Sequence, residues 1–305
     1  MTHVATFVAV RGGILDLARL CGAAAMLSHA DAPDWLAAGE AADIRFQMTD
    51  DGGAHGEASR RQLAERLAAQ AGGAVDCIVQ RDDAFRRKAL FVADMDSTMI
   101  GQECIYELAD FVGRKEQVSA ITERAMRGEI AFEPALRERV ALLRGLPAQA
   151  IETVIAERIT LTPAGATLVA TMRAHGAYTA LVSGGFTLFT RRVAALLGFD
   201  EDRANELLVE QARLTGAVRE PILGRQAKLD ALVSLRDARG LDPRATLAIG
   251  DGANDLAMLG AAGLGVAWRA KPAVAAAAQA RLEHADLAAA LFAQGYRRSE
   301  FVERG

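Results

Sequence analysis

The sequence predicts an α/β protein with a doubly wound parallel sheet, a helical insertion after the first strand of that sheet, and a small α+β domain in front of it. Short apolar runs alternate with helical periodicity over the C-terminal half, which is typical of a parallel sheet covered by helices on both faces. Two of the apolar runs, 89–93 and 246–249, lead directly into acidic residues. Open α/β sheets bind ligands at the carboxyl ends of their strands, so these acidic residues mark the expected site.

Residues 1–85 have the pattern of the small α+β domain. The expected elements are strands at 4–10, 42–48 and 75–79 and helices at 14–27 and 58–69. A polar, glycine-rich stretch over 50–56 is expected to form a loop. The charged segment 80–88 precedes the next strand, and we place the domain boundary there.

The rest of the chain changes from helical to βα periodicity. Residues 103–158 have helical spacing throughout, which predicts a helical insertion after the first strand of the parallel sheet. Beyond Pro163 the expected elements are helices at 165–175, 186–197, 226–239 and 255–262 and strands at 178–182 and 246–249. The alanine-rich run 273–280 follows Pro272, a residue that favours the first position of a helix.

Bulk composition favours a small-molecule substrate. At 305 residues the chain is longer than most single domains, so two or three units are expected. The net charge of −4, with both signs mixed along the chain, favours neither nucleic acid nor an anionic membrane. No apolar stretch approaches the ~18 residues of a membrane span. Cys21, Cys77 and Cys104 lie among apolar residues, as reduced core thiols would. We therefore expect a cytoplasmic protein with no nucleic-acid or membrane partner.

The first acidic motif supplies two carboxylates for one substrate group. Asp94 and Asp96 are two residues apart at a strand end, so their side chains project to the same side. One carboxylate can attack phosphorus to form a reactive acyl phosphate, while the other moves protons to the leaving group and from the attacking water. Such Asp-x-Asp-x-Thr patterns also occur in turns and helix caps, but the position after a buried strand raises the weight of the catalytic interpretation.

The second acidic motif occupies residues 250–255. Its glycines permit a tight turn, Asp251 can add a metal ligand, and Asn254 with Asp255 lies at a helix start. Asn254 and Asp255 could be helix caps only, an interpretation that leaves Asp251 without a role. Two strands side by side would gather Asp94, Asp96 and Asp251, where a hard cation such as Mg²⁺ would balance their charge.

Two further features suit a phosphate group. Residues 181–186 predict a strand that leads through Ser183 and Gly184 into a helix, where a hydroxyl and free N–H groups form an anion cradle. Lys228, early in the helix before the second acidic motif, could supply a fixed positive charge. Strand-to-helix turns and surface lysines are common, so these two features count only in combination with the acidic motifs.

These four motifs, in this order, resemble the haloacid dehalogenase superfamily of phosphohydrolases, and within it the phosphoserine phosphatases, over residues 88–296. The resemblance implies that Asp94 is the nucleophile of an aspartyl phosphate and Asp96 the general acid/base. It also implies Mg²⁺ held by Asp94, the backbone carbonyl of Asp96 and Asp251. The implied substrate-binding residues of the core are Ser183, Gly184, Lys228 and Asn254, with Asp255 in a supporting role.

The helical insertion resembles the small cap of that family. The resemblance implies that Glu103 meets the substrate ammonium and that Arg139 pairs with its carboxylate, as an amino-acid head group requires. Met126 and Phe132 would form an apolar lid that excludes water. Periodicity alone would place Glu103 and Arg139 on solvated helix faces, and the pattern of the whole cap favours the substrate role.

Residues 1–85 loosely resemble the small amino-acid-binding regulatory domains of the ACT type. This resemblance implies regulation by serine near the Gly12–Gly13 turn, and it leaves open a homodimer formed through this domain or through the cores. The expected domains are 1–85 (regulatory or dimerisation), 86–102 with 162–305 (catalytic core) and 103–161 (cap).

The expected function is Mg²⁺-dependent hydrolysis of O-phospho-L-serine to L-serine and phosphate, in serine biosynthesis. One alternative within the same fold is a phosphatase or phosphotransferase for another small phosphomonoester. A metabolite-binding regulator with an inactive core is the alternative from a different class.

Overall fold

The computed structural model describes residues 1–49 and 53–303. The chain divides into two compact units: the first comprises residues 1–92, 163–179 and 232–305, and the second comprises residues 93–162 and 180–231. The domain boundaries expected from the sequence stay a prediction.

An antiparallel sheet of four strands opens the first unit, in the order β2-β3-β1-β4. Its elements are the strands β1 (Thr2–Ala9), β2 (Asp34–Ala37), β3 (Ala41–Gln47) and β4 (Val75–Arg81) and the helices α1 (Leu17–Ala24) and α2 (Gly53–Ala71). Ala5 of β1 lies opposite Ile44 of β3 and Val79 of β4, and all three join Phe7 and Leu67 in one apolar core. This is the small α+β architecture expected for the N-terminal residues.

Three expectations about these residues are wrong. The stretch 50–56 is not a loop throughout, because α2 already begins at Gly53, while residues 50–52 lie outside the described part. Strand β2 was missed because its four residues are too few to show alternation. Cys21 is exposed rather than core filler, since Leu20 and Ala23 form the buried side of α1. Cys77 and Cys104 are buried, and all three thiols are free as expected.

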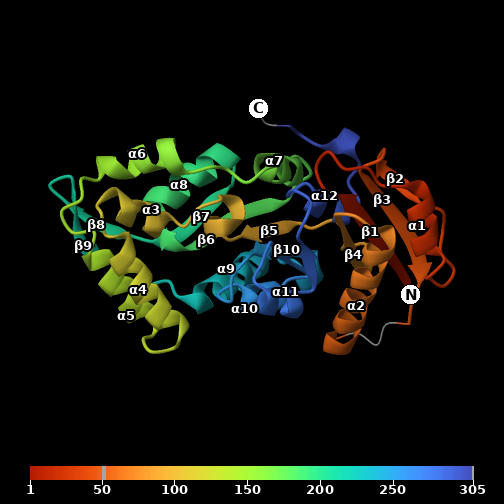
Figure 1. Cartoon of the computed structure of the whole chain (residues 1–305), viewed down its shortest axis with the longest axis horizontal. Helices are drawn as coiled ribbons and strands as arrows, with labels where there is room; N and C mark the ends of the chain where they lie inside the picture. The colour runs from red at the N-terminus through yellow and green to blue at the C-terminus, as the bar shows by residue number, and fades with distance from the viewer. Residues whose placement is uncertain (50–52, 304–305) are drawn as a thin grey trace. The chain divides into compact units, whose positions relative to one another are not determined.

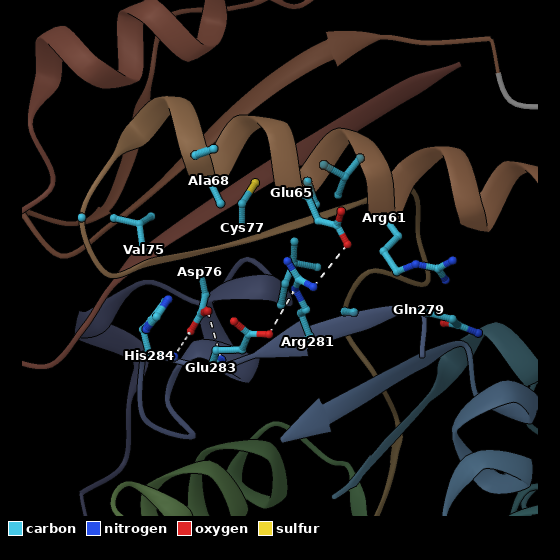
Figure 2. Close-up of a pocket in the computed structure, with 16 residues that line it drawn as sticks. Arg61, Glu65, Ala68, Val75, Asp76, Cys77, Gln279, Arg281, Glu283 and His284 are labelled. Carbon is cyan, nitrogen blue, oxygen red and sulfur yellow. Dashed lines mark hydrogen bonds and ion pairs between the residues drawn. The ribbon is translucent and has the colours of Figure 1, made fainter. Parts of the chain in front are cut away.

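Within the first unit, β4 lies next to the short strand β12 (Ala280–Leu282). Figure 2 shows the hollow between α2, β4 and this strand, where Arg281 and Asp76 have partners among the residues drawn. Asp76 of β4 accepts hydrogen bonds from the backbone N–H groups of Glu283, His284 and Ala285 at 2.8–3.0 Å. Arg281 lies between Glu65 and Glu283, at 3.3 and 3.5 Å. These contacts attach the antiparallel sheet to residues 281–285 of the same unit.

The second sheet has six strands in the order β12-β11-β10-β5-β6-β7. Besides β12, the strands are β5 (Leu90–Ala93), β6 (Tyr178–Phe186), β7 (Glu201–Asn205), β10 (Thr246–Gly250) and β11 (Leu264–Trp268). The pairs β10–β11, β11–β12 and β6–β7 are parallel. Figure 1 shows α7 (Gly165–Ala174) on one side of this sheet and α10 (Leu256–Ala261) and α11 (Pro272–Ala277) on the other. The doubly wound parallel sheet is therefore confirmed, and so is the helix that begins at Pro272.

The second unit contains the predicted helical insertion. Its helices are α3 (Cys104–Phe111), α4 (Lys115–Met126), α5 (Phe132–Ala141) and α6 (Gln149–Arg158), and after β6 the chain continues into α8 (Thr187–Leu197) and later into α9 (Arg225–Ala238). Helix α3 contacts α4 and α6, and α4 contacts α5. A hairpin of β8 (Leu207–Glu210) and β9 (Arg213–Val218) packs against α5. The sequence analysis missed this hairpin, because its strands are short and partly exposed.

Across residues 1–49 and 53–303, no helix combines the length and the apolar character that a membrane span requires.

Candidate active site

Asp94 follows a strand whose four residues are all buried. Its backbone is still extended, and the chain then turns sharply through Met95–Met99, where Ser97 adopts a left-handed conformation with φ of 54°. One carboxylate oxygen of Asp94 accepts a hydrogen bond from the Met95 N–H at 2.7 Å. The other lies 2.7 Å from Nζ of Lys228, on the first turn of α9, and both side chains are less than a tenth exposed. The turn and the lysine together fix the orientation of this carboxylate.

Asp96 lies on the same turn, but its carboxylate has different partners. Oδ1 accepts a hydrogen bond from the N–H of Cys104 at 2.9 Å, and Oδ2 accepts one from the hydroxyl of Ser183 at 3.2 Å. Burial raises the pKa of Asp96, while the hydrogen bonds from Cys104 and Ser183 and the charge of Lys228 act in the opposite direction. The two carboxylates of the first motif therefore lie in electrostatically different environments.

The segment Ser183–Gly185 lies against Asp96 at the end of β6. The hydroxyl oxygen of Ser183 accepts a hydrogen bond from the N–H of Gly185 at 2.9 Å. A Cβ on Gly185 would lie 3.0 Å from Oδ2 of Asp96 and 3.0 Å from the Ser183 hydroxyl, so any side chain here would require these two groups to shift. Ser183, Gly184 and Lys228 thus belong to one unit with the two carboxylates, and their role in binding phosphate stays a prediction.

The two acidic motifs belong to different units of the chain. Asp94 and Asp96 lie in the second unit, and Asp251 and Asp255 lie in the first. The carboxylate of Asp96 is engaged by the N–H of Cys104 and the hydroxyl of Ser183, and the ligand role expected for its backbone carbonyl stays a prediction. Asp255 is fully buried. Carboxylate oxygens suit a hard divalent cation, and the metal ligands expected from the sequence stay a prediction.

The glycines of the second acidic motif are needed for close approach. A Cβ on Gly250 would collide with the carboxyl group of Asp255, and one on Gly252 would collide with the amide oxygen of Asn254. The N–H of Gly252 donates a hydrogen bond to Oδ2 of Asp255 at 3.0 Å. Asp255 is the N-cap residue of α10, but its side chain makes no capping hydrogen bond to that helix. Asn254 precedes it and is exposed.

The cap residues expected to bind substrate lie in the same unit as Asp94 and Asp96. Glu103 precedes α3 and accepts a hydrogen bond from the hydroxyl of Ser97 at 2.8 Å. Arg139 of α5 donates to the carbonyl of Ala135 at 3.2 Å and to the hydroxyl of Thr122 at 3.4 Å, both neutral acceptors. Burial lowers the pKa of Arg139, and Tyr106 and Glu103 act in the opposite direction.

Phe132 lies against the Ser183–Gly185 segment. A Cβ on Gly184 would be 3.5 Å from its ring, so the first residue of α5 contacts this segment. Met126 ends α4, and the position of its side chain lies outside the described part. The lid roles of Phe132 and Met126 stay predictions.

Residues 91–260, more than half of the chain, match the family of haloacid dehalogenase-like hydrolases. The chain belongs to this family. A phosphoserine phosphatase from Archaeoglobus fulgidus is 43% identical over 212 residues, which cover 69% of this chain and 60% of that protein. The matched region is thus less than two thirds of this relative.

Two solved structures are similar over different lengths of the chain. A phospho-aspartyl intermediate analogue of phosphoserine phosphatase has 38% identity and a TM-score of 0.62, covering 68% of this chain and 98% of its own. A probable phosphoserine phosphatase from Vibrio cholerae, in unliganded form, has 33% identity and a TM-score of 0.72, covering 96% of this chain and 88% of its own. The second similarity includes the N-terminal antiparallel sheet.

Two residues of the site were missed by sequence reasoning. Cys104 supplies its backbone N–H to Asp96, and Asn205 contacts the carbonyl of Gly184. A backbone donor leaves no signal in the residue type. An asparagine at the end of a polar strand has no periodic pattern that could mark it.

Proposed function

We propose that this protein hydrolyses O-phospho-L-serine to L-serine and phosphate, the final step of serine biosynthesis. The observation that carries the proposal is the different environment of the two carboxylates on one turn. Asp94 lies 2.7 Å from the Lys228 ammonium, which favours its ionised form and hence a nucleophile. The carboxylate of Asp96, on the same turn, accepts hydrogen bonds from the N–H of Cys104 and the hydroxyl of Ser183. From this position it can exchange protons with substrate and water.

In the proposed reaction, a carboxylate oxygen of Asp94 attacks phosphorus and the bond from phosphorus to the serine oxygen breaks. Asp96 gives its proton to that oxygen, so that serine leaves neutral at its hydroxyl. Asp96 then takes a proton from the water that attacks phosphorus, and the bond from phosphorus to Asp94 breaks to release phosphate. Ser183 and Lys228, with the N–H of Gly184, hold the phosphoryl oxygens.

We propose that the reaction needs Mg²⁺, because the acidic residues of the two motifs supply the oxygen ligands that a hard divalent cation prefers. Asp94, Asp251 and the backbone carbonyl of Asp96 would hold it, with Asp255 in a supporting role. When bound, the cation neutralises negative charge on the phosphoryl group. After removal of metal by EDTA, phosphate release should fall to background and return with Mg²⁺. Full turnover in EDTA would refute the metal requirement.

The cap supports an amino-acid substrate. Among the described residues Arg139 forms no ion pair, so its positive charge remains for the substrate carboxylate. Glu103 would meet the ammonium group, and Phe132 and Met126 would exclude water. Asn254, which is exposed, is the remaining proposed contact to substrate.

The test measures phosphate release from phosphoserine, phosphothreonine and p-nitrophenyl phosphate. Phosphoserine should be preferred, and Asp94→Asn should abolish turnover of all three. Arg139→Ala should lower kcat/KM for phosphoserine about tenfold or more, equal to about 1.4 kcal/mol, and leave the aryl phosphate nearly unchanged. Arg137→Ala is the matched control on α5, because Arg137 is half exposed and pairs with Glu220. Equal effects of Arg139→Ala on all three substrates would favour another phosphomonoester, and no turnover at all would favour the regulator.

We also propose that residues 1–85 form an ACT-like domain that binds serine or joins two copies of the chain. Arg11 and Gly12 line a hollow of about 410 Å³ together with Glu40 and Asp286. A zwitterion such as serine needs one cation and one anion, and this hollow offers both. Serine should inhibit the full chain, and Arg11→Ala should weaken that inhibition without changing activity in its absence. Sedimentation would report the dimer, and kinetics insensitive to serine would remove the effector role.

A further inference from the structure

Asn205 ends the edge strand β7 and is 2% exposed. Strands β6 and β7 pair in parallel up to Val182 and Arg203, and the register then shifts so that Phe186 lies opposite Asn205. Residues 183–185 of β6 therefore face only one residue of β7. The Ser183–Gly185 segment leaves the ladder at this point, and its backbone groups need other partners.

The side chain of Asn205 replaces some of the hydrogen bonds that β7 does not make to this segment. Its Nδ2 donates a hydrogen bond to the carbonyl of Gly184 at 2.9 Å and another to the carbonyl of Leu223 at 3.2 Å. Its Oδ1 accepts the N–H of Leu223 at 2.7 Å. Both amide hydrogens and the amide oxygen are thus in use, which fixes the orientation of the group.

Leu223 is two residues before α9, the helix that begins at Arg225 and carries Lys228 on its first turn. One buried carboxamide therefore connects the segment that contains Ser183 and Gly184 to the start of the helix that contains Lys228. These are the groups proposed above to hold the phosphoryl oxygens.

We propose that Asn205 is a positioning residue for phosphoryl transfer, which sets the spacing between the Ser183–Gly185 turn and Lys228. The proposal rests on the function proposed above. Asn205 does not touch the reacting atoms, so it acts only through these two segments. Its loss should therefore affect the chemical step and phosphate binding more than it affects the fold.

The test compares Asn205→Asp and Asn205→Ala with wild type, using phosphoserine as substrate. Aspartate has nearly the same shape, but its carboxylate cannot donate to the carbonyls of Gly184 and Leu223 and would repel them. We expect kcat of each variant to fall at least about tenfold, and inhibition by inorganic phosphate to weaken by a similar factor. Activity is measured well below the melting temperature of each variant, so that every sample is fully folded.

Thr190→Val is the matched control for a buried hydrogen bond in the same unit. Thr190 is fully buried and donates to Asp202 of β7 at 2.5 Å, a hydrogen bond that includes neither Ser183–Gly185 nor Lys228. This variant should be less stable than wild type, but its kcat and its inhibition constant for phosphate should be unchanged. A wild-type kcat and phosphate inhibition in folded Asn205→Asp and Asn205→Ala would overturn the positioning role. Absence of turnover in wild type would instead overturn the proposed function.

Discussion

Replacing Arg86 by methionine should destabilise the protein by roughly 3–5 kcal/mol, because it leaves a buried carboxylate without its counter-charge. Arg86 Nη2 lies 2.8 and 2.7 Å from the two carboxylate oxygens of Asp43, whose side chain is fully buried. The same guanidinium donates to the hydroxyl of Thr6 at 3.2 Å and to the carbonyl of Ala293 at 3.0 Å. In the variant, Thr6 is the remaining donor to Asp43.

Urea denaturation followed by circular dichroism measures this loss. Arg87→Met is the matched control, because Arg87 is half exposed and its pair with Glu300 should contribute at most about 1 kcal/mol. Adding Asp43→Asn to Arg86→Met removes the uncompensated charge and should restore a large part of the stability. A loss below about 1 kcal/mol in Arg86→Met, or no recovery in the double variant, would refute the reasoning.

The pH dependence gives a second check on the same pair. Burial raises the pKa of Asp43, while Arg86 and Thr6 act in the opposite direction. Without Arg86 that pKa rises further. A carboxyl whose pKa is higher in the folded state stabilises the fold when protonated, and this contribution is lost as pH rises through the folded-state pKa. The deficit of Arg86→Met relative to wild type should therefore be largest near neutral pH and shrink in acid. A deficit that grows in acid would contradict this assignment.

Three further predictions concern other parts of the chain. Gly185→Ala should lower kcat about tenfold, since its Cβ would crowd Asp96 and Ser183, while Gly260→Ala, with open space around it, should leave kcat unchanged. Burial lowers the pKa of Lys88 to about 8, so Lys88 loses its proton at a lower pH in the folded state than in the unfolded state. The free energy of unfolding of wild type should therefore rise between about pH 8 and 10, by up to about 3 kcal/mol relative to Lys88→Met. Under native conditions iodoacetamide should modify exposed Cys21, whereas the two buried thiols should react only after unfolding, as mass spectrometry of peptides would show.

The sequence was most informative where a buried strand ends in a charged residue. Asp94 and Asp251 stand out because each follows an apolar run, and an ionised group directly after such a run is unusual unless it has a function. Strand β7 could not be found in this way, because an edge strand with the sequence Glu-Asp-Arg-Ala-Asn shows no apolar run. The position of Asn205 depends on a register shift between two strands, which a single sequence does not encode locally.

The partners of the acidic residues were only partly predictable. Spacing places Asp94 and Asp96 on one side of the chain, but the left-handed turn at Ser97 and the hydrogen bonds from Cys104 and Ser183 give Asp96 partners of its own. Asp255 looked like a helix cap, because its role depends on close approach to the glycines at 250 and 252. Local patterns identify which residues are charged, whereas tertiary contacts decide which charges meet.

Helix α3 starts at the very residue whose N–H binds the carboxylate of Asp96. The positive end of the helix dipole is therefore directed at the carboxylate of Asp96, the proposed general acid/base. A tilt of α3 would move the N–H of Cys104 and so disturb the orientation of that carboxylate. The acid–base step proposed for Asp96 would therefore depend on the position of α3.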